Sequence, residues 1–290
     1  MLDVIVRPEE PLARGGDVRA ATRAGAGGQA ANVAAWAASL GADARCVAKR
    51  GDDAAGELVA RELAAHGVEL VGPVGAGASG IVVSVVEEGE RSLASDRGVA
   101  PSLEPEELDA AWFDCDVLHL SGYALLREPI SGAALLAARL AREAGARVSV
   151  DVAAWTEIRR FGPVEFRALL DELAPDVLFA TEAEWELLGG AYLSAPTGVL
   201  KRGPRGITVL TDETRLDFAA LATDVVDATG AGDALAAGFL VGLAGPSAEP
   251  AAPSEDPGRP RRPVGGTLEE AARRGLEAAA RCVAKVGSLP

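Results

Sequence analysis

From residue 29 onward, short apolar runs alternate with longer segments of helical period. This alternation is typical of β-α-β units arranged around a mainly parallel sheet. Strands are expected at 45–49, 117–120, 147–151, 177–180 and 207–211. Helices are expected at about 29–40, 53–66, 130–144, 163–173, 182–188, 232–243 and 267–286, and three of them can end at Gly41, Gly67 and Gly145. The pattern predicts an α/β fold with an open sheet and helices on both faces.

Two stretches break this alternation. Residues 81–96 contain two β-type runs around a glycine-containing turn, which predicts a hairpin. Segments 2–7 and 17–22 also have the pattern of strands, so we expect a small second sheet formed by about 2–22 and 80–97. Residues 245–266 are rich in Pro, Gly and charge and are expected to form a mobile surface loop. We expect one domain, spanning 1–290.

The charge balance limits the partners of this chain. Its formal net charge is −15 and its pI is near 4.7. Binding to a polyanion requires clustered Lys and Arg, so no nucleic acid and no membrane is expected as a partner. Cys46, Cys115 and Cys282 fit neither a disulfide framework nor a zinc site and are expected to be reduced. There is no apolar run of about 18 residues and no signal-peptide core, which favours a cytoplasmic protein.

The strongest chemical signal is the heptapeptide Asp-Ala-Thr-Gly-Ala-Gly-Asp, from Asp227 to Asp233, which leads directly into an apolar helix. Glycines before a helix let consecutive N–H groups point into one concavity, and the helix dipole adds positive potential there. This arrangement predicts an anion hole. Asp233 could be a helix cap, or it could be a base that takes a proton from a hydroxyl attacking the bound phosphate. We favour the base.

A second glycine-rich segment lies at 25–34. Its glycines allow a ligand to approach the backbone, and Asn32 offers both donors and an acceptor to hydroxyl groups. The segment also matches the dinucleotide pattern G-x-G-x-x-A, but residues 19–23 before it are polar and alanine-rich rather than an apolar strand. A glycine turn before a helix, without any ligand, is the structural alternative.

These segments resemble two signatures of the ribokinase-like (PfkB) carbohydrate kinases. Residues 227–233 resemble the D-[TA]-T-G-A-G-D signature, and Gly27, Gly28 and Asn32 resemble the G-G-x-x-x-N signature. Further matches run from residue 2 to about 287. The resemblance implies a ribokinase-like three-layer α/β/α sandwich, with the small sheet as a lid and as the contact of a homodimer. It also implies an ATP-dependent kinase that phosphorylates a hydroxyl of a small sugar or sugar acid.

The resemblance implies a role for each matching residue. Asp233 is expected to be the catalytic base, and the anion hole is expected to form from Gly230, Ala231 and Gly232. Sugar binding is implied for Asp3, Gly27, Gly28, Gln29 and Asn32. ATP binding is implied for Thr181, Lys201, Gly203 and Gly206. Metal roles are implied for Glu184, which organises Mg²⁺ through water, and for Asp227 and Thr229 at a K⁺ site.

The sequence departs from the family at two places. Thr181 replaces an Asn, and the apolar strand that usually precedes the position of Asp3 is missing. Glu184 could be an ordinary helix acid, and 201–206 could be an ordinary charged turn, while His66 and His119 are expected to be structural. Two other functions stay open: a nucleoside kinase of the same fold, or a truncated sugar-binding relative without catalysis. Segments 25–32 and 81–100 contain no aromatic residue to stack a base, which favours a sugar.

Overall fold

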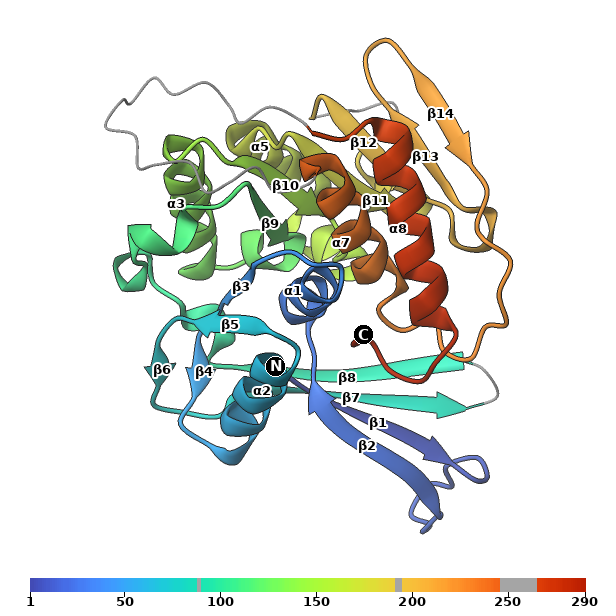
Figure 1. Ribbon diagram of the computed structural model, residues 1–290. Coiled ribbons are helices and arrows are strands. Elements are labelled where there is room, and N and C mark those ends of the chain that lie inside the picture. Colours follow the sequence, from blue (N-terminus) through green and yellow to red (C-terminus); the bar gives the residue numbers. More distant parts are fainter. Residues whose placement is uncertain (88–89, 191–194, 246–264) are drawn as a thin grey trace.

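A computed structural model describes residues 1–87, 90–190, 195–245 and 265–290. Its main sheet has six strands in the order β14-β13-β12-β11-β10-β9 (Figure 1). Four of them pair in parallel: β9 (Val117–Ser121), β10 (Arg147–Asp151), β11 (Val177–Thr181) and β12 (Thr197–Lys201). The last two pair antiparallel: β13 (Ile207–Leu210) and β14 (Arg215–Phe218). The predicted open, mainly parallel sheet is confirmed.

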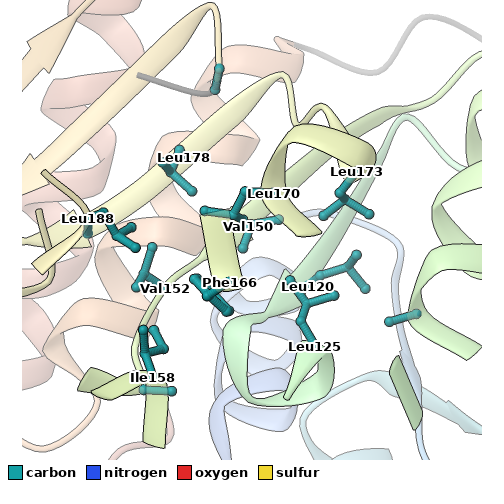
Figure 2. Close-up of a cluster of buried hydrophobic side chains, with 14 of the residues drawn as sticks. Leu120, Leu125, Val150, Val152, Ile158, Phe166, Leu170, Leu173, Leu178 and Leu188 are labelled. Atoms are coloured by element: carbon teal, nitrogen blue, oxygen red, sulfur yellow. The ribbon is translucent and has the colours of Figure 1, made fainter. Parts of the chain in front are cut away.

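Helices cover both faces of this sheet, so the body has three layers. One face carries α3 (Ile130–Glu143), α4 (Trp155–Phe161) and α5 (Pro163–Leu173). Their apolar side chains, among them Ile158, Phe166 and Leu170, pack against Val150 and Leu178 of the sheet (Figure 2). These side chains are removed from water, which is the main contribution to the stability of the layer.

The other face carries α7 (Ala231–Ala244) and α8 (Leu268–Val283), with α1 (Gln29–Ser39) beside them. Phe179 of β11 contacts Phe239 of α7 edge to face, with ring centroids 5.5 Å apart. Val33 and Trp36 of α1 pack against Ala237 of α7. This packing fixes the position of both helices whose N-termini carry the glycine-rich motifs.

The predicted small sheet is also present. It contains four strands in the order β2-β1-β7-β8: β1 (Leu2–Pro8), β2 (Ala20–Ala26), β7 (Ser79–Glu87) and β8 (Glu90–Gly98). It stands at the side of the body where α1 begins (Figure 1). The strand expected at 17–22 begins later and runs directly into Gly27, because it pairs along the whole of β1. Most of the loop expected to be mobile lies outside the described residues, at 246–264.

The remaining strands are short. β3 (Ala44–Val47) pairs with β5 (Val68–Val71), and β4 (Arg50–Gly51) pairs with β6 (Val74–Gly75). The other helices are α2 (Ala54–Ala65) and α6 (Glu182–Leu187), with 3₁₀ turns at Ala100–Ser102, Pro105–Glu107, Ala110–Phe113, Gly122–Leu125 and Gly203–Arg205. Gly41, Gly67 and Gly145 have φ of +93°, +76° and +86° and follow α1, α2 and α3 as predicted. Across the described ranges, no helix combines the length and apolar character needed to cross a membrane.

The contact between α7 and α8 depends on glycine at position 238. A Cβ placed there would lie 2.4 Å from the carbonyl oxygen of Arg274 and 2.9 Å from Cα of Gly275. We expect Gly238→Ala to force the helices apart and to lower the free energy of unfolding by about 1–3 kcal/mol, the range of overpacking substitutions. Urea denaturation measures this change.

Gly132→Ala in α3 is the matched control. A Cβ there meets only side-chain atoms, at 3.3 Å from Glu128 and 3.4 Å from Pro105. Because Ala is a better helix former than Gly, this variant should be unchanged or more stable by up to about 1 kcal/mol. Equal unfolding midpoints for the two variants would contradict the close packing of α7 on α8.

Candidate active site

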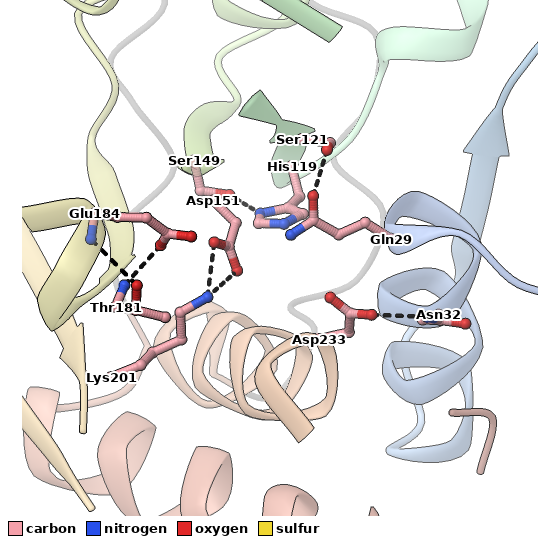
Figure 3. Close-up of polar contacts among 10 residues, drawn as sticks. All are labelled: Gln29, Asn32, His119, Ser121, Ser149, Asp151, Thr181, Glu184, Lys201 and Asp233. Carbon is pink, nitrogen blue, oxygen red and sulfur yellow. Dashed lines mark hydrogen bonds and ion pairs between the residues drawn. The ribbon is translucent and has the colours of Figure 1, made fainter. Parts of the chain in front are cut away.

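The polar residues of the two motifs meet at the carboxyl edge of the main sheet. Asp151, Thr181 and Lys201 are the last residues of β10, β11 and β12, and Asp233 lies in the first turn of α7. Figure 3 shows these side chains pointing toward one another, with Asn32 and Gln29 reaching in from α1. In open α/β sheets, ligands bind at this edge because the chain reverses there and side chains from several strands converge.

Asp233 is held by a residue far away in the sequence. Nδ2 of Asn32 donates to Oδ2 of Asp233 over 2.7 Å. Oδ1 of Asn32 in turn accepts from the hydroxyl of Ser288 over 3.0 Å, which sets the orientation of the amide. Asn32 was predicted to contact a sugar, and the structure adds a bond to the expected base. No local pattern pointed to Ser288, because it is separated from Asn32 by 256 residues.

The environment of Asp233 changes its acidity. Burial, together with the nearby carboxylates of Asp151 and Asp3, raises the pKa of Asp233 to about 7. The hydrogen bond from Asn32 and the charge of Lys201 oppose this rise. A carboxyl group with a pKa near neutral pH can both accept and return a proton, which is the property expected of a general base.

Lys201 and Asp151 form a buried ion pair beside Asp233. Nζ of Lys201 lies 2.7 and 2.6 Å from the two carboxylate oxygens of Asp151, whose side chain is fully buried. Burial alone would lower the pKa of Lys201, but Asp151, Glu184 and Asp233 raise it, so the ammonium keeps its charge. The sequence left open an ordinary surface turn at 201–206; for Lys201 that alternative is wrong.

The first turn of α7 has the backbone needed to bind an anion. Gly230 has φ of +77°, a left-handed conformation that favours glycine. A Cβ at Gly232 would lie 3.4 Å from Nζ of Lys201, so the ammonium stands directly over the predicted anion hole. The N–H of Ala231 makes a long bond to the carbonyl of Ala228, at 3.3 Å. N–H groups in a first helical turn have no acceptor within the helix and are available to a ligand.

A cavity of about 1520 Å³ opens in front of Asp233. The residues predicted to bind sugar all line it: Asp3, Gly27, Gly28, Gln29 and Asn32. Gly27 lets the carboxylate of Asp3 lie against the backbone, because a Cβ at Gly27 would be 2.0 to 2.4 Å from that group. Oε1 of Gln29 accepts a hydrogen bond from Ser121 of β9. The strand that precedes this glycine segment, β2, belongs to the small sheet and is exposed along most of its length, so it is not the apolar strand of a dinucleotide-binding unit.

Thr181 and Glu184 cap helix α6 together. The N–H of Thr181 donates to Oε2 of Glu184 over 2.7 Å, and the hydroxyl of Thr181 accepts from the N–H of Glu184 over 3.3 Å. Glu184 is nevertheless buried and adds to the negative charge around Lys201, so it is not an ordinary solvated acid. Within the described ranges, no group of three or more His, Cys, Asp or Glu is arranged to hold a metal ion.

The turn after β12 points most of its charge away from the anion hole. Arg202 pairs with Asp217, and Arg205 pairs with Glu182 at the surface. Gly206 has φ of +88°, and a Cβ there would be 2.0 Å from the carbonyl of Phe218. Gly203 is also left-handed, at φ of +58°. The two glycines therefore shape a tight loop between β12 and β13 next to Lys201.

Asp227 organises the loop before α7. Its oxygens accept from the N–H groups of Thr229 and Gly287 over 2.9 and 3.1 Å, and Arg7 lies 3.4 Å away. Burial alone would raise the pKa of Asp227, but these donors and the charge of Arg7 hold it below its usual value. A bound K⁺ at Asp227 and Thr229 would have to share the carboxylate with Arg7.

The cavity and the site also contain residues that were not predicted to take part, among them Asp151, Arg97 and Tyr123. Asp151 follows an apolar strand in the sequence, and Arg97 and Tyr123 come from separate segments, with the guanidinium 4.1 Å above the ring centroid. His119 contacts Ser149 through Nδ1 over 2.9 Å, and burial, with the charge of Lys201, lowers its pKa to about 3. His119 is therefore neutral, as expected of a structural residue.

Comparison with known proteins places this arrangement in one family. The family model for pfkB family carbohydrate kinases matches residues 1–290. An ATP-dependent ribose-1-phosphate kinase from Halopiger xanaduensis is 36% identical over 251 residues, covering 82% of this chain and 80% of the relative. A fructokinase from Escherichia coli is 32% identical over 235 residues, covering 75% and 76%.

Solved structures have the same fold. An adenosine kinase from Sinorhizobium meliloti superposes with a TM-score of 0.81 at 24% identity, covering 100% of this chain and 93% of the other. A sugar kinase from Pyrococcus horikoshii, solved in complex with ATP, gives 0.80 at 22% identity with the same coverage. The family match over the full length, with a ribokinase-like three-layer architecture, shows that this chain is a member of the pfkB family of carbohydrate kinases.

Proposed function

We propose that this kinase transfers the γ-phosphate of ATP to a hydroxyl of a small sugar or sugar acid, with Asp233 as the catalytic base. One observation carries the proposal. The carboxyl group of Asp233 has a pKa of about 7 and lies between the sugar-side cavity and the N-terminus of α7. It is therefore within reach of a hydroxyl on one side and of a phosphate bound at the helix on the other.

The reaction follows from these positions. The substrate hydroxyl donates its proton to Asp233 while its oxygen attacks the γ-phosphorus. The bond between that phosphorus and the bridging oxygen of the β-phosphate breaks, and ADP leaves. Negative charge on the transferred group is stabilised by the N–H groups of Gly230, Ala231 and Gly232 and by Lys201. Asn32 keeps the accepting carboxylate in position through its 2.7 Å bond.

We assign ATP binding to Thr181 and to the loop from Lys201 to Gly206, with Gly203 at its turn. The hydroxyl of Thr181 accepts one bond in its cap and can still donate to a phosphate oxygen. Glu184 fits a role at Mg²⁺, since the cap uses only Oε2 and carboxylate oxygens are preferred by this ion. Bound Mg²⁺ would neutralise phosphate charge, and K⁺ at Asp227 and Thr229 would act only on the loop before α7.

On the sugar side, we assign the binding of substrate hydroxyl groups to Asp3, Gln29 and the backbone at Gly27 and Gly28. A carboxylate can accept from two neighbouring hydroxyls, and the two glycines let the sugar approach the chain closely. The small sheet contributes Asp3 and so serves as a lid. Its pairing between two subunits, and a cytoplasmic location, stay predictions.

The substrate carries an anionic group in this proposal. Arg97 of β8 lines the cavity, stacked on Tyr123, and pairs with no carboxylate among the described residues. An unpaired guanidinium in a chain of net charge −15 is an efficient site for a phosphate or carboxylate. The ribose-1-phosphate kinase relative acts, by its name, on a substrate of this kind.

A nucleoside is the second candidate substrate. Tyr123 lies in the cavity, although the segments considered from sequence contained no aromatic residue, and an aromatic ring can stack a base. The ring is already covered by Arg97, which favours an anionic sugar over a nucleoside.

We expect Asp233→Asn to lower kcat by about 10²- to 10⁴-fold, because Asn keeps the shape of Asp but cannot accept the proton. ATP affinity should be unchanged or slightly higher, since a negative charge near the γ-phosphate is removed. Coupled ADP release and ATP titration measure the two effects. Asp53→Asn, at the N-terminus of α2, is the matched control and should retain kcat. A folded Asp233→Asn enzyme with kcat within fivefold of the parent, on the order of 1 kcal/mol, would mean that Asp233 is only a cap.

The pH dependence of kcat/KM provides a separate test. The base must be ionised, so kcat/KM should rise with pH through an apparent pKa near 7 and then level off. Asn32 stabilises the ionised form, so Asn32→Ala should move this rise to higher pH. Ser288→Ala removes only the hydrogen bond that orients the Asn32 amide, so it should cause a smaller shift in the same direction. If kcat/KM of Asn32→Ala rises at the same pH as that of the parent, Asp233 is not the group whose ionisation causes the rise.

Arg97→Ala tests the anionic substrate. The KM for a phosphorylated or carboxylated sugar should rise by about 10- to 100-fold, the scale of a lost charge-assisted bond, while the KM for neutral sugars should not change. Arg127 lines the same cavity but is paired with Glu157, so Arg127→Ala is the control and should have little effect. The same KM increase for neutral and anionic sugars would rule out an anion site at Arg97.

A further inference from the structure

Two arginines of the small sheet reach the loop before α7 and the segment after α8. Arg7 of β1 and Arg23 of β2 lie on one face of this sheet, because Arg23 pairs with Ile5, two residues from Arg7. Nη2 of Arg7 lies 3.4 Å from Oδ2 of Asp227. Nη1 of Arg23 donates to the carbonyl oxygen of Val286 over 3.2 Å, in the segment after α8 that runs beside the small sheet (Figure 1). One face of the sheet thus brings two positive charges to these two segments.

The carboxylate at this contact is the one expected to bind K⁺. Potassium ions in proteins are held by oxygen atoms that replace their hydration shell. The side chain of Asp227 is only 7% exposed. Its oxygens already accept from three donors: the N–H groups of Thr229 and Gly287, and Arg7. A cation at this carboxylate would stand beside a guanidinium, and like charges repel at that distance. Asp227 therefore has its positive partner within the chain.

The segment at 286–288 also orients the proposed base. Ser288 donates its hydroxyl to Oδ1 of Asn32 over 3.0 Å, and Asn32 donates to Asp233 over 2.7 Å (Figure 3). A Cβ at Gly230 would lie 2.6 Å from Cβ of Ser288, so the same segment packs on the backbone of the proposed anion hole. Holding this segment in place therefore holds both the carboxylate that is to accept a proton and the turn that is to bind the phosphate.

We propose that Arg7 and Arg23 are positioning residues that take the place of K⁺ beside Asp227. Their guanidinium groups hold the loop before α7 and the segment at 286–288 against the small sheet, so the kinase needs no monovalent cation. Their role rests on the proposed function, because these segments orient the proposed base. The same face of β1 carries Asp3 at the sugar-side cavity. The position of the small sheet and the orientation of the base are therefore linked.

Thermal unfolding in two chloride salts at equal ionic strength tests the two arginines without turnover. A ligand that binds only the folded state raises the unfolding midpoint. We expect the midpoint of the parent to agree within about 1 °C in KCl and in tetramethylammonium chloride, whose cation is much larger than K⁺. Arg7→Ala frees the carboxylate of Asp227, so its midpoint should be lower and should rise by about 2 °C or more when KCl replaces the other salt. A parent midpoint raised by K⁺, or no response to K⁺ in either protein, would overturn the proposal.

Turnover provides the second readout. The kcat of the parent should be the same in both salts. Without K⁺, Arg7→Ala should lower kcat by about tenfold or more, because a displaced catalytic group is costly, and KCl should restore part of the loss. The pH at which kcat/KM rises should also move upward in this variant, since the Asn32 amide is held less firmly. Arg23→Ala removes one exposed bond to a carbonyl and should cause a smaller loss.

Arg215→Ala is the matched control. Arg215 lies 3.4 Å from Asp217 on β14, the same separation as in the pair at Asp227, and should change neither kcat nor its response to K⁺. Activation of the parent by K⁺, or an unchanged kcat in Arg7→Ala without K⁺, would overturn the proposal. A folded parent without turnover on any acceptor would instead contradict the proposed function, and the unfolding midpoints would still decide the role of the two arginines.

Discussion

The hydrogen bond between Asn32 and Asp233 joins the two helices on which the site depends. α1 and α7 each begin with glycines, and each brings one side of the proposed site: the groups assigned to substrate hydroxyls from α1, and the helix end assigned to the phosphate from α7. Because the two helices pack on each other and on α8, their first turns stay at a fixed distance. A carboxyl group at that junction is desolvated, which raises its pKa to about 7 and suits it to accept a proton from an alcohol.

The buried pair of Lys201 and Asp151 explains how so many carboxylates can share this site. Four carboxylates interact electrostatically with one another or with Lys201: those of Asp3, Asp151, Glu184 and Asp233. The chain as a whole is already strongly acidic. A buried ion pair contributes little net stability, since desolvation offsets most of the attraction. Its role here is positional, because it holds an ammonium group at the N-terminus of α7, where we propose that the phosphate binds. Removing Asp151 would take away the partner that keeps this ammonium in place.

The sequence predicted the elements that have a strong local signal. Seven helices, the hairpin and the glycine-rich helix starts were predictable because period, caps and left-handed glycines are local properties. α4, β12 and β14 were missed, since they are short and their apolar residues are few or interrupted. The sequence pointed to the motif residues that meet at the candidate site, although their roles stay predictions. It did not point to Asp151, Ser288 and Arg97, because their positions depend on contacts across the fold. The start of β2 moved for the same reason: its pairing with β1, and not its composition, sets its length.

Phosphorus NMR of the reaction mixture shows whether the chain transfers phosphate from ATP to a sugar hydroxyl. The purified protein is incubated with ATP, Mg²⁺ and K⁺ and, in separate samples, with pentoses, hexoses, sugar phosphates, sugar acids and nucleosides. We expect at least one sugar or sugar acid to give a new phosphate ester resonance that grows in step with ADP, and no new ester to appear without an acceptor. Formation of only ADP and inorganic phosphate, or no loss of ATP with any acceptor by a folded protein, would contradict this expectation.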